Sequence, residues 1–322
     1  MKRRHFMLRA SQGILGMSLF GLHACRKKKK HTLIASPQDP QEDTLSPLFF
    51  KISLAQWSLH RALRAGEIKN LDFATKSRSF GCEGLEYVNS FFKEKAKDMA
   101  YLKEMNLRAD AEGQENVLVM IDGEGQLADA DTQKRIEAID NHYKWVEAAH
   151  FLGCHAIRVN LAGGVDPLEA SKAAVDSLHR LSEFAKGSNI SVLVENHGGF
   201  SSNGDWMSQV FSNIRQDNCG TLPDFGNFCI TKDENRNCLE AYDRYKGVKQ
   251  LLPFAKAVSA KSYDFDAEGR ETTIDYMKMM QMVKDSGYNG FVGIEYEGKK
   301  ISEEAGIKLT KDLLIKVGRQ LS

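Results

Sequence analysis

The sequence lacks several features that would place it in common functional classes. Its 44 basic and 43 acidic side chains leave a net charge of +1, so it has no strong positive field for a nucleic acid. No two of its six cysteines are spaced as Cys-x-x-Cys, which leaves no zinc-knuckle signal and no clear disulfide framework. Cys229 and Cys238 could pair within one loop, but their spacing alone does not favour this.

Residues 1–25 predict an export signal. They begin with basic residues, continue with an apolar run over 14–22 that is shorter than the roughly 20 residues of a membrane-spanning helix, and end at Cys25. Arg3 and Arg4 resemble a twin-arginine signal, and the letters LHAC resemble a bacterial lipobox whose cysteine is lipidated. We expect an exported protein of the periplasm or cell envelope, anchored by a lipid on Cys25. The alternative is a plain cleaved signal with an incidental cysteine.

Residues 26–48 are polar and contain prolines, and they predict a flexible tether. The tether begins with five consecutive basic residues. Beside a lipid anchor, these charges would add attraction to anionic headgroups. The predicted folded domain therefore spans residues 49–322.

From residue 49 the chain alternates between short apolar, β-branched runs and longer segments of helical periodicity. Strands are predicted at 50–59, 82–88, 116–121, 155–161, 190–196, 220–225, 257–263 and 291–296. Helices are predicted at 132–153, 167–187, 274–288 and 302–321, with left-handed glycine caps at Gly153, Gly187 and Gly287. Eight such units predict an α/β fold, a single-domain (β/α)8 TIM barrel. A doubly wound sheet is the alternative, but no glycine-rich loop follows the first strand.

Polar side chains, many of them acidic, stand at the predicted strand ends. They are Gln56 and His60, Glu86 and Asn89, Asp122 and Glu124, Arg158 and Asn160, Glu195 and His197, Asp224 and Asn227, Lys261, Tyr263 and Asp264, and Glu295 and Glu297. In a barrel these ends meet at one mouth, which is where active sites form. Crowded carboxylates repel one another unless a cation neutralises them. The oxygen and imidazole donors favour one divalent metal ion among Mn, Mg, Co, Fe and Zn.

Alternation along the fifth predicted strand narrows this set. Residues i and i+2 share a face, so Glu195 and His197 both point into the mouth while Asn196 points away. Asp224 ends the next strand, and Glu295 ends the last. Asp224 could alternatively serve as a helix N-cap, and Glu297 could replace or support Glu295.

Three motifs, VLVENHGG at 192–199, LPDFGN at 222–227 and VGIEYEG at 292–298, resemble the xylose-isomerase-like TIM-barrel superfamily. The sugar phosphate isomerase/epimerase family is the most similar part of it, and the resemblance extends from about residue 50 to the end. It implies that Glu195, Asp224 and Glu295 hold a divalent metal and that the two glutamates flank the reacting carbon.

The seventh strand departs from the family pattern. The resemblance implies a metal-binding histidine there followed by a lysine two residues on, but this chain has Ser259 and Lys261. The site could recruit His197, use a water held by Ser259, bind metal weakly or bind none. Lys261 matches the family lysine and is expected to contact substrate oxygens.

Other mouth residues are predicted to bind the carbohydrate substrate. They are Glu86, Arg158, Asn160, His197, Lys261, Trp57 and His60. Structural alternatives exist for several, since Glu86 could pair with an arginine and Trp57 could be ordinary packing. Related abasic-site endonucleases need more histidines and a basic mouth, so no nucleic-acid partner is expected.

These residues predict a metal-dependent isomerase or epimerase of a sugar or keto-sugar. Carboxylates would move the proton through a metal-stabilised enediolate. One alternative is a keto-sugar or keto-glycoside lyase or hydratase at the same site. A second, motivated by Ser259, is a non-catalytic carbohydrate-binding lipoprotein.

Overall fold

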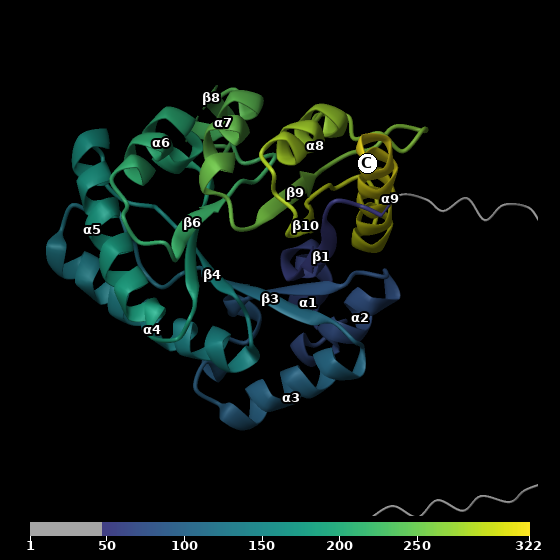
Figure 1. Cartoon of the computed structure of the whole chain (residues 1–322), viewed down its shortest axis with the longest axis horizontal. Coiled ribbons are helices and arrows are strands. Elements are labelled where there is room, and N and C mark those ends of the chain that lie inside the picture. The colour runs from purple at the N-terminus through teal and green to yellow at the C-terminus, as the bar shows by residue number, and fades with distance from the viewer. Residues whose placement is uncertain (1–46) are drawn as a thin grey trace, which may run out of the picture. The chain divides into compact units, whose positions relative to one another are not determined.

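The computed structural model describes residues 47–322 (Figure 1). The predicted signal, nearly all of the tether and the lipidation site Cys25 lie outside these residues. Eight parallel strands form one sheet in the order β6-β5-β4-β3-β2-β1-β10-β9. They are β1 Lys51–Ala55, β2 Gly84–Val88, β3 Glu115–Met120, β4 Ala156–Asn160, β5 Ser191–Glu195, β6 Cys219–Leu222, β9 Val258–Ser262 and β10 Phe291–Tyr296. All eight predicted strands are present.

Parallel bridges between the two end strands close the sheet into a barrel. Thr221 pairs with Ala255, and Asp224 pairs with Ser259. The backbone N–H of Ser259 donates to the carbonyl of Pro223 at 2.9 Å, and Phe225 N–H donates to the carbonyl of Ser259 at 3.1 Å. The predicted TIM barrel is therefore confirmed. Its seam runs directly beside Asp224.

Helices surround the strands (Figure 1). They are α1 His60–Ala65, α2 Phe73–Ser79, α3 Met99–Ala111, α4 Thr132–Leu152, α5 Pro167–Lys186, α6 Gly204–Ser212, α7 Arg244–Leu251, α8 Tyr276–Asp285 and α9 Glu303–Leu321. Short 3-10 turns, η1 Gln56–Leu59, η2 Asn70–Asp72, η3 Asn89–Phe91, η4 Lys93–Lys95, η5 Gly199–Ser202 and η6 Leu252–Phe254, fill the connections. Within residues 47–322, no helix has both the length and the apolar character to cross a bilayer.

Side-chain caps fix the ends of the long helices. The carboxylate of Asp131 accepts backbone N–H groups at the start of α4, and Asp166, followed by Pro167, does the same for α5. Gly153 ends α4 in the left-handed conformation (φ 76°), as predicted. The cap predicted at Gly187 is wrong. Gly187 stays right-handed at φ −61°, and Asn189 two residues later takes the positive φ of 54°.

The barrel interior is apolar further down the strands and polar at their carboxyl ends. Alternation along the strands turns Leu118, Leu193 and Leu222 inward, where they form a small fully buried cluster. Two residues beyond Leu193 and Leu222 stand Glu195 and Asp224. The apolar cluster therefore supports a polar layer at the carboxyl ends of the strands.

A hairpin that the sequence did not predict follows β6. Strands β7 Cys229–Lys232 and β8 Cys238–Ala241 pair antiparallel, and Cys229 and Cys238 form a disulfide. The pairing was not favoured from spacing because two cysteines nine residues apart carry no register information. A tight turn stabilised by Asp233 and Asn237 brings them together. The other cysteines of the described chain, Cys82, Cys154 and Cys219, are buried and free.

Helix α9 packs on β10 without room for a side chain at Gly306. A Cβ there would overlap the ring of Tyr296, which is fully buried. We therefore expect Gly306→Ala to lower the free energy of unfolding by about 1–3 kcal/mol through overpacking. Chemical denaturation monitored by circular dichroism measures this. Gly187→Ala is the matched control, because its Cβ would meet only Phe184 O at 3.8 Å, and we expect no loss of stability. Equal effects of the two changes would contradict this account of the packing.

Candidate active site and metal centre

Three carboxylates converge at the mouth of the barrel. Glu195, Asp224 and Glu295 each offer one oxygen, and these oxygens all lie within 4.8 Å of one another. The three side chains are only 1%, 0% and 4% exposed. They come from β5, the residues after β6, and β10, so the closed barrel brings together groups that are up to 100 residues apart. Among the described residues they form a candidate metal centre.

The loop after β6 presents Asp224 in a fixed orientation. Its Oδ1 accepts the backbone N–H groups of Gly226 and Asn227, both at 2.7 Å, which leaves Oδ2 facing the centre. Gly226 is needed for this turn because a Cβ would lie 2.6 Å from Cγ of Lys261 and 2.5 Å from the Tyr263 hydroxyl. Asp224 is thus a turn-forming residue, although no helix follows it, and a member of the acidic centre.

Asn196 positions the backbone of Asp224. Its Oδ1 accepts the backbone N–H of Asp224 at 2.8 Å, and its Nδ2 donates to the Asp224 carbonyl at 3.0 Å. The sequence predicted that Asn196 points away from the mouth and gave this residue no role. A buried polar side chain at a strand end needs hydrogen-bond partners, but the sequence does not show which groups they are.

Ser259 lies between two of the carboxylates. Its Oγ is 2.7 Å from Asp224 Oδ2 and 2.8 Å from Glu295 Oε2. A hydroxyl has one proton, so it can donate to only one of these oxygens at a time. The position where the family resemblance implies a histidine is therefore filled by a small group that links two acids. His197 does not take its place in the described structure: it stands exposed at the rim and is not part of the three-carboxylate group.

Two buried cations lie against the acidic centre. Lys261 Nζ is 2.8 Å from Glu295 Oε1 and 3.2 Å from Glu297 Oε2. Arg158 Nε is 2.9 Å from Glu195 Oε2, and its Nη1 donates to Asp122 Oδ1 at 2.8 Å. Two predicted substrate-binding residues thus form ion pairs within the protein.

The amide of Asn160 joins the arginine cluster. Its Nδ2 donates to Asp122 Oδ1 at 2.8 Å, and its Oδ1 accepts from Arg158 Nη1 at 3.2 Å. On the opposite side of Glu195, Asn227 Nδ2 donates to Glu195 Oε1 at 3.1 Å. These contacts hold Glu195 between an amide and a guanidinium group.

Burial dominates the electrostatics of the carboxylates. It raises the pKa of Glu195 to about 7, against the opposing charge of Arg158. Burial likewise raises the pKa of Asp224 to about 7, although Lys261 opposes the shift. Burial alone would lower the pKa of Lys261, but the surrounding carboxylates raise it well above its usual value. The centre therefore has more carboxylates than neighbouring cations to neutralise them.

The residues present fit a divalent metal ion. Glu195 Oε2 is buried and lies 2.9 Å from Arg158 Nε but receives no well-aligned hydrogen bond, and all three donors are hard carboxylate oxygens. Among the described residues, two cations, Arg158 and Lys261, form ion pairs with five carboxylates: Asp122, Glu195, Asp224, Glu295 and Glu297. A further positive charge would relieve the repulsion among these acids, which adds to the effect of burial in raising the pKa values of Glu195 and Asp224.

The aromatic residues at the rim form a stack of their own. The Trp57 and His60 rings are stacked with centroids 5.0 Å apart, and the Arg64 guanidinium lies 4.8 Å from the Trp57 ring. Trp57 Nε1 also donates to Glu297. The predicted sugar platform is therefore a ring that His60, Arg64 and Glu297 already contact.

Glu86 lies one layer deeper than the acidic centre. Its carboxylate contacts Ser53 Oγ and the backbone of Gly293, two residues before Glu295. Burial raises the pKa of Glu86 to about 8, and its Oε2 has no hydrogen-bond partner. It does not pair with an arginine, so that structural alternative is wrong. Burial therefore favours the protonated, uncharged form of Glu86.

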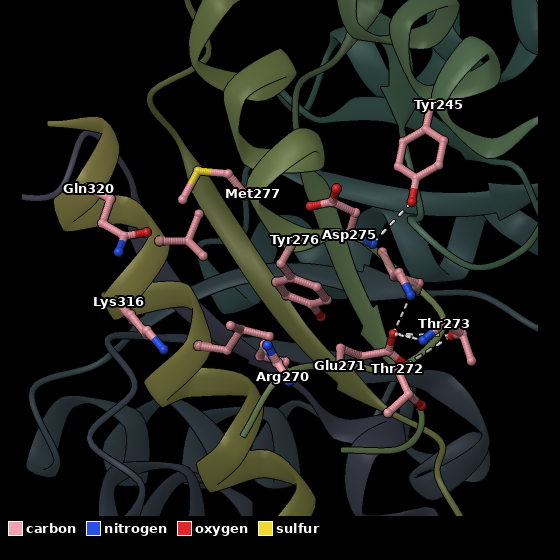
Figure 2. A pocket seen from close by; sticks show the side chains of 13 residues that line it. Tyr245, Arg270, Glu271, Thr272, Thr273, Asp275, Tyr276, Met277, Lys316 and Gln320 are labelled. Atoms are coloured by element: carbon pink, nitrogen blue, oxygen red, sulfur yellow. Dashed lines mark hydrogen bonds between the residues drawn. The ribbon is translucent and has the colours of Figure 1, made fainter. Parts of the chain in front are cut away.

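A hollow of about 620 Å³ lies on another part of the surface (Figure 2). Tyr245 of α7, the segment from Arg270 to Met277 and Lys316 of α9 border it, and none of the three centre carboxylates does. Glu271 accepts the backbone N–H of Thr273 at 2.6 Å and also that of Ile274, and thereby shapes the loop. The Glu271 carboxylate is therefore hydrogen-bonded within this loop.

Comparisons with known proteins identify the architecture. A model of the xylose isomerase-like TIM barrel family matches residues 74–317. A D-tagatose 3-epimerase-like protein superposes with a TM-score of 0.65 at 16% identity, covering 85% of this chain and 100% of the other. A search of curated proteins found no match.

Two further solved structures have the same fold. The 3-keto-D-glucoside 4-epimerase of E. coli, in its apo form, has a TM-score of 0.61 at 14% identity, with 83% of this chain and 99% of the other covered. A xylose isomerase-like TIM barrel protein from Mycobacterium smegmatis, in complex with magnesium, has a TM-score of 0.63 at 14% identity, with 85% and 98% covered. Similarity at these identities establishes the shared fold.

The raised pKa of Glu86 predicts a pH-dependent stability. Its folded-state pKa of about 8 exceeds the ordinary 4.5, so the folded protein holds this proton more tightly than the unfolded chain. This stabilisation is fully present below pH 4.5 and is lost as the pH rises through 8. Glu86→Gln imitates the neutral acid and removes the loss. We expect the variant to match the wild type near pH 5 and to exceed it by about 2–4 kcal/mol at pH 9.

Urea unfolding of both proteins at several pH values measures this difference. A stability difference that stays constant from pH 5 to pH 9 would show that Glu86 titrates normally.

Proposed function

The chain belongs to the xylose isomerase-like TIM barrel family, and we propose that it is a metal-dependent epimerase or isomerase of a sugar or keto-sugar. The observation that carries the proposal is the convergence of Glu195, Asp224 and Glu295 oxygens within 4.8 Å at the barrel mouth. The class of reaction is supported by the same fold in a D-tagatose 3-epimerase-like protein and a 3-keto-D-glucoside 4-epimerase.

Glu195, Asp224 and Glu295 would hold one divalent cation. When bound, such an ion neutralises the carboxylates and polarises a substrate carbonyl and the hydroxyl beside it. The all-oxygen donor set suits Mg²⁺ or Mn²⁺ well and also accepts Co²⁺, Fe²⁺ and Zn²⁺. The magnesium complex of a protein with the same fold supports this choice.

Two carboxylates on different strands provide the proton transfers. Glu195 on β5 and Glu295 on β10 are separated around the barrel by β6 and β9, so they approach a bound sugar from different sides. One removes the proton next to the carbonyl, and the other returns a proton to the opposite face. Return to the same carbon gives epimerisation, and return to its neighbour gives isomerisation.

The surrounding charges prepare Glu195 for this role. The Arg158 guanidinium and the Asn227 amide hold it in place at 2.9 and 3.1 Å. Lys261 does the same for Glu295 at 2.8 Å.

We propose further that the enzyme is exported and anchored through Cys25. This part rests on the sequence of residues 1–25, which lie outside the described structure. Sugar phosphates are mostly cytoplasmic, so an exported enzyme would meet a free sugar, a keto-sugar or a keto-glycoside.

Removal of either catalytic carboxylate tests the proposal. We expect Glu195→Gln and Glu295→Gln to lower the rate of solvent-deuterium exchange into the substrate by at least about 100-fold, because each loses a positioned acid–base group. The substrate panel contains D-tagatose, D-psicose, D-fructose, L-ribulose and 3-keto-D-glucosides. Metal content is measured on the same samples by mass spectrometry and is expected to fall in both variants.

Glu304→Gln is the control, because Glu304 lies on α9, is half exposed and pairs with Lys76 outside the mouth. Unchanged exchange and metal content in Glu195→Gln would refute the site assignment. Loss of water or an alcohol from the product would identify a lyase or hydratase instead. Sugar binding by calorimetry without any exchange would identify a carbohydrate-binding protein.

A further inference from the structure

A separate hollow of about 490 Å³ opens at the rim beside the acidic centre. This volume is in the range of small-molecule sites. Its lining includes Leu161, Gly163, His197, Phe200, Ile230 and Lys232. We call it the rim cavity.

The rim cavity is walled by continuations of the strands that carry the site. Leu161 directly follows Asn160 at the end of β4, and His197 stands two residues beyond Glu195. The β7 wall follows the turn of Asp224 within five residues. The rim cavity therefore adjoins the mouth in which a sugar ring would react.

The disulfide-linked hairpin makes one wall of the rim cavity rigid. Strand β7 packs against the turn η5, and its antiparallel partner β8 is joined to it through Cys229–Cys238. At the base, the Tyr242 N–H donates to the Phe228 carbonyl at 2.8 Å, and Phe228 packs on Gly247 of α7. A preformed wall of this kind costs little conformational entropy when a ligand binds.

The chemistry of the rim cavity differs from that of the acidic centre. None of the described residues that line it is acidic, the side chain of Lys232 is exposed, and Leu161, Phe200 and Ile230 contribute apolar surface. The glycine pairs at 163–164 and 198–199 expose bare backbone, and a Cβ at Gly198 or Gly199 would meet only open space. Such a surface accepts an uncharged ring through apolar contact and backbone hydrogen bonds.

We propose that the rim cavity binds the uncharged ring-shaped substituent, a second sugar or an aryl group, of a glycosidic substrate. This inference rests on the proposed function, because it places the reacting ring at Glu195, Asp224 and Glu295. The preferred substrate is then a glycoside and not a free monosaccharide.

The test compares substrates that differ only in the substituent. The probes are methyl and 4-nitrophenyl 3-keto-D-glucosides, in both anomeric forms, together with free D-tagatose and D-fructose. The full protein is expected to show at least a tenfold higher kcat/KM, measured by solvent-deuterium exchange, on one 4-nitrophenyl glucoside than on the matching methyl glucoside. Calorimetric binding of the same two probes is measured in parallel.

Two substitutions on the hairpin provide the matched comparison. Ile230→Trp fills the rim cavity and is expected to reduce the preference for the 4-nitrophenyl substituent to less than threefold. Leu239→Trp places the same side chain on β8, where Leu239 is 70% exposed and does not line the rim cavity, and is expected to keep the preference.

The outcomes separate this inference from the proposed function. Exchange with equal kcat/KM for both glucosides, or an equal loss in both tryptophan variants, overturns the rim-cavity inference and leaves the proposed function intact. Calorimetric preference for the 4-nitrophenyl probe that Ile230→Trp removes, without exchange in any sugar, supports the rim cavity and refutes the proposed function. Absence of both exchange and binding preference refutes both.

Discussion

Buried negative charge at the barrel mouth is the constraint on which the rest of this structure depends. Glu195, Asp224 and Glu295 are almost without solvent, so their repulsion is not screened by water. The protein compensates in three ways: Arg158 and Lys261 supply positive charge, Ser259 bridges two acids, and burial raises the pKa of two of them. The remaining excess of carboxylates makes a divalent cation the natural complement of the site.

The same residues that build the site also close the barrel. Asp224 belongs to the seam between β6 and β9, where it pairs with Ser259, and Asn196 holds its backbone. Substituting these residues therefore disturbs both the fold and the site. Glu86 extends this coupling inward, since an acid with a pKa of about 8 links the stability of the barrel interior to pH. The apolar cluster inside the barrel and the helices packed around it hold the buried charged groups in position.

The eight strands and their order could be predicted because hydrophobic periodicity is a local property and the barrel is built from local repeats. The candidate ligands followed from their position at strand ends. Asn196, the hairpin and the disulfide were not predicted, for different physical reasons. Asn196 bonds to backbone groups of Asp224, which is 28 residues away in the sequence. A hydrogen bond between residues so far apart in the sequence produces no periodic pattern that could be recognised in it. The hairpin is short and exposed, so β7 and β8 carry no apolar alternation that would distinguish them from a loop.

The sequence by itself determined which residues stand at the carboxyl ends of the strands, because strand periodicity and strand ends are encoded over a few neighbouring positions. It also carried the family motifs around Glu195, Asp224 and Glu295. Only the tertiary structure decided how these groups are paired: that Arg158 and Lys261 bind carboxylates, that Ser259 joins Asp224 to Glu295, and that His197 lies at the rim. The reason is that charge pairing and desolvation depend on distances of a few ångströms across the closed barrel, and these distances arise only when strands far apart in the sequence meet.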